Sequence, residues 1–269
     1  MMRRNAIVIM LGGWMLLALA GPWLAPQSMR AQNRAAVLEA PSAQHWLGTD
    51  EFGRDEMARL LMASGLTTML ALAMALPALA LAVALGVGAA MTPAAQPLAR
   101  SAGEIARSLP WIFVLVAVRA LLPLDAGPWL TGACLAGLFA VASWPVAAWT
   151  LQGAARGLMQ QDFVRAASGL GENRRQLLLR HLWPHLRGLI ATYFALLLAG
   201  AIGAEVGLEL VGLGLPQPWP TWGNMLLPLA DYTIATRCWW LYAPLLLIVP
   251  VLLALTLAAG HQEPASQLG

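Results

Sequence analysis

The chain has 269 residues, of which 59% are hydrophobic and 11% are charged, and its mean hydropathy is +0.66. Soluble domains carry about 25% charged and about 45–50% apolar residues, so this composition excludes a water-soluble globule. Two cysteines exclude a disulfide-rich scaffold, and a net charge of +3 gives no argument for a nucleic-acid partner. We therefore expect an all-α, polytopic membrane protein with a single transmembrane domain over residues 1–269.

Long apolar runs predict six membrane-spanning helices of about 20 residues, separated by polar or proline- and glycine-rich segments. The first run follows Arg3-Arg4 and is longer than the apolar core of a signal peptide, so we favour an uncleaved helix over a cleaved signal. Pro77 interrupts the second run, which transmembrane helices tolerate when neighbouring helices satisfy the freed backbone groups. The spans are expected at about residues 6–25, 66–91, 108–124, 129–151, 188–211 and 238–260.

The 16 basic residues, all of them arginine, predict the orientation of these spans. With the N-terminus inside, the inner segments hold more arginines than the outer ones, and such an excess marks the cytoplasmic side. We therefore expect both termini and the arginine-rich loop 152–187 in the cytoplasm, and the long polar loop 27–64 outside. Tryptophans near the proposed outer ends are expected to form an interfacial aromatic belt; they are Trp23, Trp129, Trp219, Trp222, Trp239 and Trp240.

Acidic residues are concentrated near the end of loop 27–64, where a cation site is one interpretation. Interleaved Arg54 and Arg59 would neutralise it, so we favour a solvated or subunit-facing helix. Neither the histidines nor the cysteines have metal-ligand spacing, so no metal or other cofactor is expected in this chain. The absence of lysine excludes a glycine-rich phosphate loop of the ATPase type. The acidic residues are Asp50, Glu51, Asp55 and Glu56.

The most informative pattern lies in loop 152–187. Asp162 is suited to the N-cap of a short helix, and four small or apolar residues recur after it at helical spacing. Gly171 permits a left-handed turn, and a second helix is expected from about Asn173 to His181, before Pro184. These residues favour equally a surface that docks a partner and an interfacial helix on anionic lipid. The stripe consists of Phe163, Ala166, Ala167 and Leu170.

Two glutamates, Glu205 and Glu209, lie four residues apart near the outer end of the fifth span. A carboxylate at membrane depth is costly and marks a pathway or gate; the alternative is that both are solvated at the interface. Residues 212–226 are rich in glycine, proline and tryptophan, and we expect them to fold over the outer mouth rather than form an ordinary surface loop. The candidate gate residues in this segment are Gly212, Gly214, Trp222 and Asn224.

Three motifs occur in order along the chain. Residues 45–55 read His-Trp-Leu-Gly-Thr-Asp-Glu-Phe-Gly-Arg-Asp; residues 165–184 read Arg-Ala-Ala, three residues, Gly, nine residues, then His-Leu-Trp-Pro. The third motif combines Gly-Leu-Gly-Leu-Pro-Gln-Pro at 212–218 with Trp-Gly-Asn-Met-Leu at 222–226. Together they resemble the permease subunits of bacterial ABC importers, in particular the binding-protein-dependent dipeptide, oligopeptide and nickel family. The acidic-to-proline spacing from Glu104 to Pro110 is also similar to that family.

The resemblance implies a six-helix permease that forms half of the translocation pathway for a solute delivered by a binding protein. Di- or oligopeptides are the first expectation for that solute, and nickel or a metal chelate is the alternative. A membrane-embedded enzyme and an assembly protein are remoter alternatives. The implied coupling helix, which would dock an ATPase subunit, contains Asp162, Phe163, Arg165, Ala166, Ala167, Leu170 and Gly171.

The implied location is the bacterial inner membrane, and the implied partners follow from the family. They are a second homologous permease subunit in a heterodimer, two cytoplasmic ATPase subunits or domains, an extracytoplasmic solute-binding protein and membrane lipids. ATP hydrolysis would belong to the partner subunits, so this subunit is not expected to be an enzyme.

The chain also departs from the family pattern. Arg165 stands where the family often has glutamate, and His185 replaces a common asparagine. Glu205 matches an acidic position of the family, whereas Glu209 stands where a small or hydroxyl residue is usual. The end of the chain lacks the Asp-containing polar segment that usually follows the sixth helix.

Overall fold

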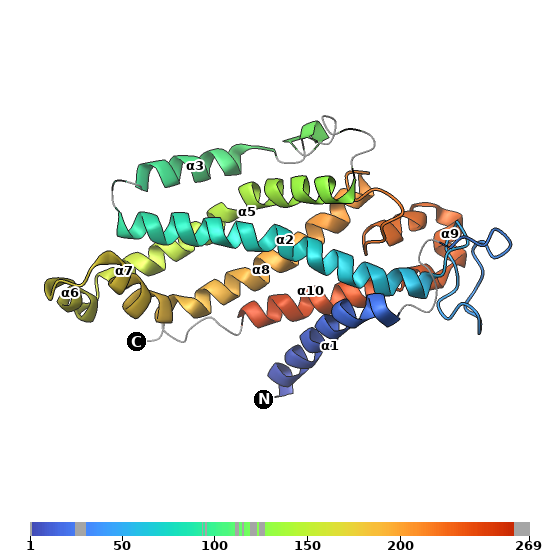
Figure 1. Cartoon of the computed structure of the whole chain (residues 1–269), viewed down its shortest axis with the longest axis horizontal. Coiled ribbons are helices and arrows are strands. Elements are labelled where there is room, and N and C mark those ends of the chain that lie inside the picture. The colour runs from blue at the N-terminus through green and yellow to red at the C-terminus, as the bar shows by residue number, and fades with distance from the viewer. Residues whose placement is uncertain are drawn as a thin grey trace.

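The computed structural model describes residues 2–24, 31–92, 94, 96–110, 113, 114, 116–118, 123 and 127–260, and the regular elements in these ranges are helices (Figure 1). The long helices are α1 (Met2–Leu24), α2 (Glu56–Met91), α3 (Gln96–Ser108), α5 (Pro128–Met159), α8 (Trp183–Leu210) and α10 (Leu245–Gly260). The short ones are α6 (Asp162–Gly169), α7 (Arg174–Gln176), η2 (Leu177–Leu182), η3 (Asn224–Ala230), α9 (Tyr232–Arg237) and η4 (Trp239–Tyr242).

Among the described residues, five helical stretches are long and apolar enough to cross a membrane. They correspond to the first, second, fourth, fifth and sixth predicted spans. The predicted third span, 108–124, lies partly outside the described residues and stays a prediction. The five stretches are Asn5–Leu24, Glu56–Met91, Pro128–Met159, Arg174–Leu210 and Trp239–Gly260.

Two helices extend further than the apolar runs indicated. Helix α2 begins at Glu56 rather than at residue 66, because the side chain of Asp55 caps it by accepting a hydrogen bond from the backbone N–H of Ala58 at 2.7 Å. The loop that was predicted to extend to residue 64 therefore ends at Asp55. Helix α5 continues to Met159, beyond the predicted end at 151.

The expected break before Pro184 was wrong. The helix runs through this proline, and the π-helix η2 lies directly before it. Proline has no N–H and its ring clashes with the carbonyl four residues earlier in an α-helix. In the wider π turn, the N–H of Trp183 bonds to the carbonyl of Leu178 instead, five residues back. The result is a continuous helical stretch from Arg174 to Leu210.

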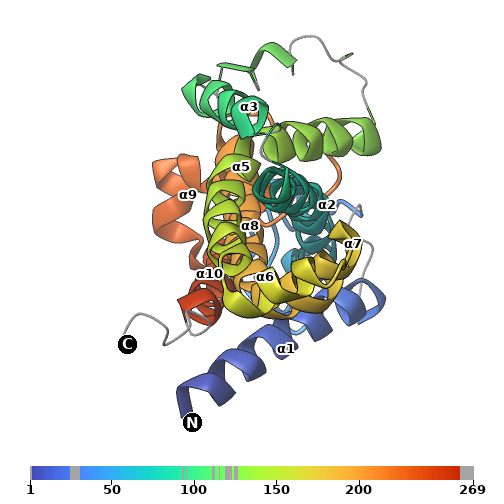
Figure 2. The same cartoon turned by 90° about the vertical axis from the view of Figure 1, so that its left-hand side faces the viewer.

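Helix α2 is the centre of the bundle and packs against α1, α5 and α8, while α10 packs against α8 and α1 (Figures 1 and 2). Small residues allow close approach between these helices, as in other membrane bundles. At Gly86, a Cβ atom would overlap the backbone carbonyl of Ala148 in α5. At Gly65, a Cβ atom would lie 3.0 Å from the carbonyl oxygen of Ala18 in α1. These contacts make α2 a rigid support for both ends of the molecule.

The predicted aromatic belt is only partly correct. Trp23, Trp129 and Trp239 are exposed, as a belt requires. Trp222 and Trp240 are buried in the protein instead, because their indole N–H groups bond to partners on distant segments. Tryptophan at a membrane interface normally keeps its polar edge in contact with water or headgroups, so these two residues serve internal packing.

Candidate functional site

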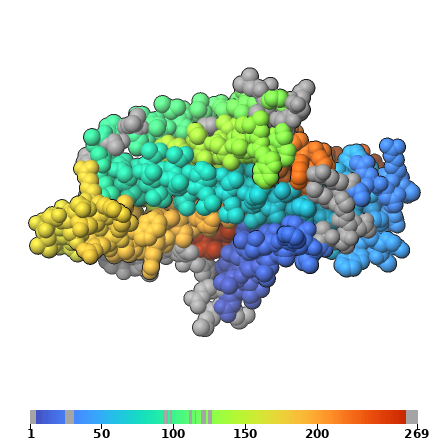
Figure 3. Space-filling model, viewed as in Figure 1, coloured from blue at the N-terminus to red at the C-terminus, as the bar shows by residue number. Residues whose placement is uncertain are grey.

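Helices α6 and α7 project beyond the bundle at one end of the molecule, and the loop before α2 lies at the other (Figures 1 and 3). The predicted N-cap was wrong by one residue: Gln161 is the N-cap of α6, and no side chain caps it. Met159 ends α5, so the chain needs two residues to turn before α6 begins. Asp162 lies in the first turn, where its negative charge interacts favourably with the helix dipole.

The predicted stripe on α6 divides into two faces. Ala167 packs into the bundle together with Val164, so it is not available to a partner. Phe163, Ala166 and Leu170 are exposed, and Leu170 has 87% of its surface accessible. We call these three residues the α6 apolar face. The helix is thus fixed to the bundle on one side and leaves apolar side chains exposed on another, where the ring of Phe163 also contacts those of His181 and His185.

The turn after α6 agrees with the sequence expectation. Gly171 has a φ of +90°, in the left-handed region that favours glycine. Asn173 then begins α7 with a capping box, in which its side chain and that of Gln176 each accept a backbone N–H of the other. Glu172 lies 2.9 Å from Nε2 of His181, which connects the turn to η2. These contacts hold α6 in one orientation relative to α8.

At the opposite end of the fifth span, Glu209 is buried and fully engaged. Its Oε1 accepts hydrogen bonds from the N–H of Leu215 at 2.9 Å and from the hydroxyl of Thr221 at 3.2 Å. A Cβ atom on Gly214 would overlap the carboxylate of Glu209, so only glycine fits there without displacement. The carboxylate therefore fastens the segment after α8 to the helix, and the solvated alternative is wrong.

Glu205 is buried as well, with 1% of its surface exposed. Among the described residues, no well-aligned hydrogen bond reaches either carboxylate oxygen, although the Thr221 hydroxyl and the Gly223 backbone N–H lie close to this group. The backbone of Gly223 lies against it, since a Cβ atom at that glycine would be 3.1 Å from Oε1. A buried carboxylate without aligned hydrogen bonds is costly, which keeps Glu205 a candidate pathway residue.

The segment 212–226 folds over these glutamates, as expected, and the φ of Gly212 is +73°. Trp222 is fully buried: its backbone N–H donates to Thr67 at 3.0 Å and its indole N–H donates to Ser64 at 3.2 Å. Asn224 is buried and bonds to the carbonyl of Trp219 at 2.7 Å. The four predicted gate residues thus belong to one closed segment that packs on α2 and α8.

The acidic cluster before α2 was wrongly expected to be solvated or to face a subunit. Asp50 lies 2.7 Å from Nε of Arg54 and 3.5 Å from Nε of Arg59, and all three are buried. Arg54 also donates to the side chain of Gln217 at 3.0 Å. Burial is tolerated because opposite charges are paired. The cluster ties the loop before α2 to the segment after α8. Glu51 alone of the four predicted acidic residues is exposed; Asp50, Asp55 and Glu56 are buried.

Sequence reasoning missed two residues of this outer site. Thr221 bonds to Glu209 and, through its backbone N–H, to Asn224. Gln217 receives the hydrogen bond from Arg54. Gln217 lies inside the third motif and Thr221 lies directly before its second part. This position in the motif was the one signal that could have identified them. Their partners are too far away in the sequence for spacing to reveal them.

Comparison with known proteins identifies the family of this chain. Residues 64–267 match the family described as the binding-protein-dependent transport system inner membrane component. The chain belongs to this family. It is an ABC transporter permease component of the inner membrane with several membrane spans, and not an enzyme.

Individual relatives of this permease are peptide permeases. A putative peptide permease protein of Brucella suis biovar 1 is 31% identical over 205 residues, covering 76% of this chain and 66% of that protein, just under two thirds of its length. The di/tripeptide transport system permease protein DppC of Pseudomonas aeruginosa is 32% identical over 248 residues, covering 89% of this chain and 79% of that protein. A putative peptide transport system permease protein of Brucella suis is 26% identical over 226 residues, covering 84% and 74%.

Proposed function

We propose that this permease forms half of the translocation pathway of an ATP-driven importer for di- and oligopeptides. A second, homologous permease would supply the other half, two cytoplasmic ATPase subunits or domains would drive it, and a solute-binding protein would deliver the cargo. The observation that carries the mechanism is the protruding helix α6, which is anchored to the bundle and leaves its apolar face exposed. The names of the relatives support peptides as cargo.

The proposed orientation places α6 and both termini in the cytoplasm and six spans in the membrane. Two features support it: α10 runs toward the end of the molecule where α6 lies and the N-terminal end of α1 is the nearer of its two ends to α6 (Figure 1), and loop 152–187 is rich in arginine. ATP-driven closure of the ATPase pair would move α6, and the bundle would alternate between outward-open and inward-open states.

Cargo choice is tested with the assembled transporter in proteoliposomes that contain ATP and receive the cognate binding protein outside. We expect ATP-dependent uptake of a labelled dipeptide and no uptake without ATP. Nickel ions and a nickel chelate are measured in the same vesicles. Uptake of either nickel form without uptake of peptide would overturn the assignment of peptides as cargo. An ATPase rate that does not change when any of these solutes is added would overturn the transport role.

The two glutamates are expected to behave differently in that assay. Glu205→Gln should lower peptide uptake about tenfold, as expected for the loss of one charge-assisted hydrogen bond to a passing group. Glu209→Gln should leave uptake within about twofold, because the amide oxygen can still accept the bonds from Leu215 and Thr221. The thermal unfolding temperature of each variant serves as the folding control. Unchanged uptake in both variants would remove both residues from the pathway.

A further inference from the structure

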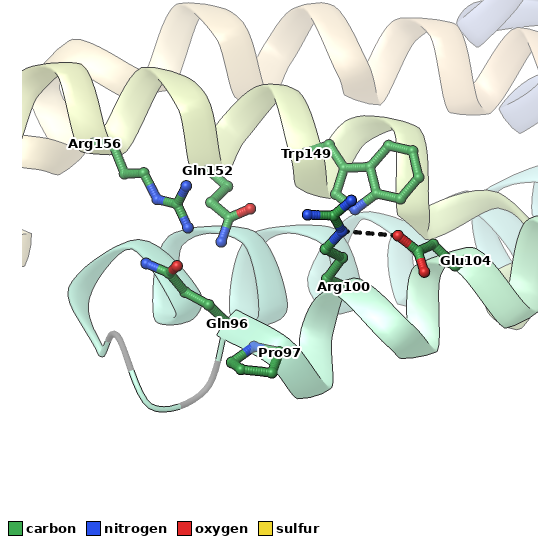
Figure 4. Close-up of a pocket in the computed structure, with 7 residues that line it drawn as sticks. All are labelled: Gln96, Pro97, Arg100, Glu104, Trp149, Gln152 and Arg156. Atoms are coloured by element: carbon green, nitrogen blue, oxygen red, sulfur yellow. Dashed lines mark hydrogen bonds and ion pairs between the residues drawn. The ribbon is translucent and has the colours of Figure 1, made fainter.

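A cavity with several polar side chains in its lining lies between α3 and α5 (Figure 4). Its volume is about 560 Å³, which is in the range of small-molecule binding sites. Helix α3 supplies Gln96, Arg100 and Glu104, and α5 supplies Trp149, Gln152 and Arg156. The spacings on each helix place these side chains on one face, so two polar stripes face each other.

The cavity contains cationic donors that the protein does not fully use. Nε of Arg156 is buried and has no hydrogen-bond partner among the described residues. Arg100 bonds to Glu104 at 2.8 Å, but its side chain is largely exposed and has further N–H groups. The guanidinium carbon of Arg107 lies 4.7 Å from the ring centroid of Trp149, so a third arginine lies beside this lining residue. The lining charges favour an anion with several acceptor oxygens, and phosphate suits arginine geometry.

Apolar residues follow the cavity-lining part of α3 in the sequence. Ile105, Leu109 and Phe113 follow the polar part of α3, and all three are exposed. Exposed apolar residues next to a cationic cavity suit an amphiphile, which has an acyl chain beside its headgroup. A free phosphate ion would use the cavity but not this surface.

The depth of the cavity also suits a lipid headgroup. Arg156 lies in the last turn of α5, whose end at Met159 leads directly into the protruding segment. Under the proposed orientation, that end lies on the cytoplasmic side of the membrane. Basic pockets between transmembrane helices on that side bind anionic headgroups.

We propose that the α3–α5 cavity binds the phosphate of an anionic phospholipid, with Arg156 and Arg100 as donors. Gln152 and Gln96 supply further donors across the cavity, and the acyl chains lie along the apolar residues that follow α3. The inference rests on the proposed function only for the side of the membrane on which the cavity lies.

The test uses the purified transporter with all its subunits in detergent and counts bound molecules by native mass spectrometry. Phosphatidylglycerol, phosphatidylcholine and inorganic phosphate are titrated separately. We expect preferential binding of phosphatidylglycerol, weakened about fivefold by Arg156→Gln, since one arginine near a membrane surface contributes about that factor. Arg156→Lys should keep much of the preference. Glu104→Gln should strengthen binding, because it removes a like charge and frees Arg100.

Arg175→Gln is the matched control, since it removes an exposed arginine outside the cavity and should leave lipid binding unchanged. Equal binding of the two phospholipids, or binding indifferent to Arg156→Gln, would overturn the proposal. Displacement of the lipid by equimolar inorganic phosphate would assign the cavity to a free anion and would also overturn it. If a second permease subunit covers the cavity in the transporter, no lipid binding that depends on Arg156 will be detected. That result would also overturn the proposal. No cargo is involved, so failure here leaves the peptide-transport proposal standing.

Discussion

Replacing Leu170 by aspartate is expected to release the ATPase subunits from the permease. Leu170 is 87% exposed on the α6 apolar face, and a charge placed in an apolar cleft of a partner is left without compensation. Loss of a central contact in such an interface costs about 2 kcal/mol or more, which is about thirtyfold in Kd. The measurement is the fraction of ATPase subunit that co-purifies with tagged permease, together with the cargo-stimulated ATPase rate.

Leu179→Asp provides the control, because Leu179 is also an exposed leucine of loop 152–187 but lies on η2. It should retain the ATPase subunits. Both variants should unfold at the wild-type temperature, since exposed substitutions change stability by only about 0.5 kcal/mol. Equal retention of ATPase subunits by Leu170→Asp and the wild type would contradict docking on the α6 apolar face and would favour contact of this helix with lipid.

Replacing Trp222 by alanine is expected to cause the largest loss of stability in the chain. Trp222 is fully buried, and both its backbone and its indole N–H donate hydrogen bonds to α2. Truncation leaves a large cavity and removes the indole hydrogen bond to Ser64, at a cost of about 3–5 kcal/mol, whereas the backbone bond to Thr67 is retained. The unfolding free energy of the detergent-solubilised permease measures this loss, and peptide uptake should fall with it because the segment over Glu205 loses its anchor.

Two further variants separate packing from general effects of tryptophan. Trp239→Ala removes a tryptophan that is 68% exposed and should change the unfolding free energy by less than about 0.5 kcal/mol. Trp222→Phe keeps an aromatic ring but loses the bond to Ser64, at a cost of about 1 kcal/mol. Similar losses for the alanine variants at positions 222 and 239 would show that the segment is not anchored through Trp222.

Five spans and the position of α6 could be predicted because their signals are local. Apolar length determines a span, and the glycine at position 171 ends α6 through its own backbone conformation. The coarse location of the outer site was also predictable, since Glu205 and Glu209 are carboxylates within an otherwise apolar helix. In each case the decisive residues lie within a few turns of one another.

The contacts that decide burial join segments far apart in the chain, and no local pattern contains them. Arg54 pairs with Gln217, and the indole of Trp240 donates to the backbone of Thr49. For the same reason, charged residues that look suited to water are buried before α2. The helix through Pro184 was missed because the π turn before it removes the clash that normally ends a helix.

The uninterrupted stretch from Arg174 to Leu210 has a mechanical consequence. Its 37 residues form a rod of about 55 Å, with α6 attached near one end and Glu205 and Glu209 near the other. A tilt of about 5° at the inner end displaces the outer end of such a rod by about 5 Å. In the proposed transporter, a movement of α6 at one end of this helical stretch is therefore transmitted directly to Glu205 and Glu209 at the other end.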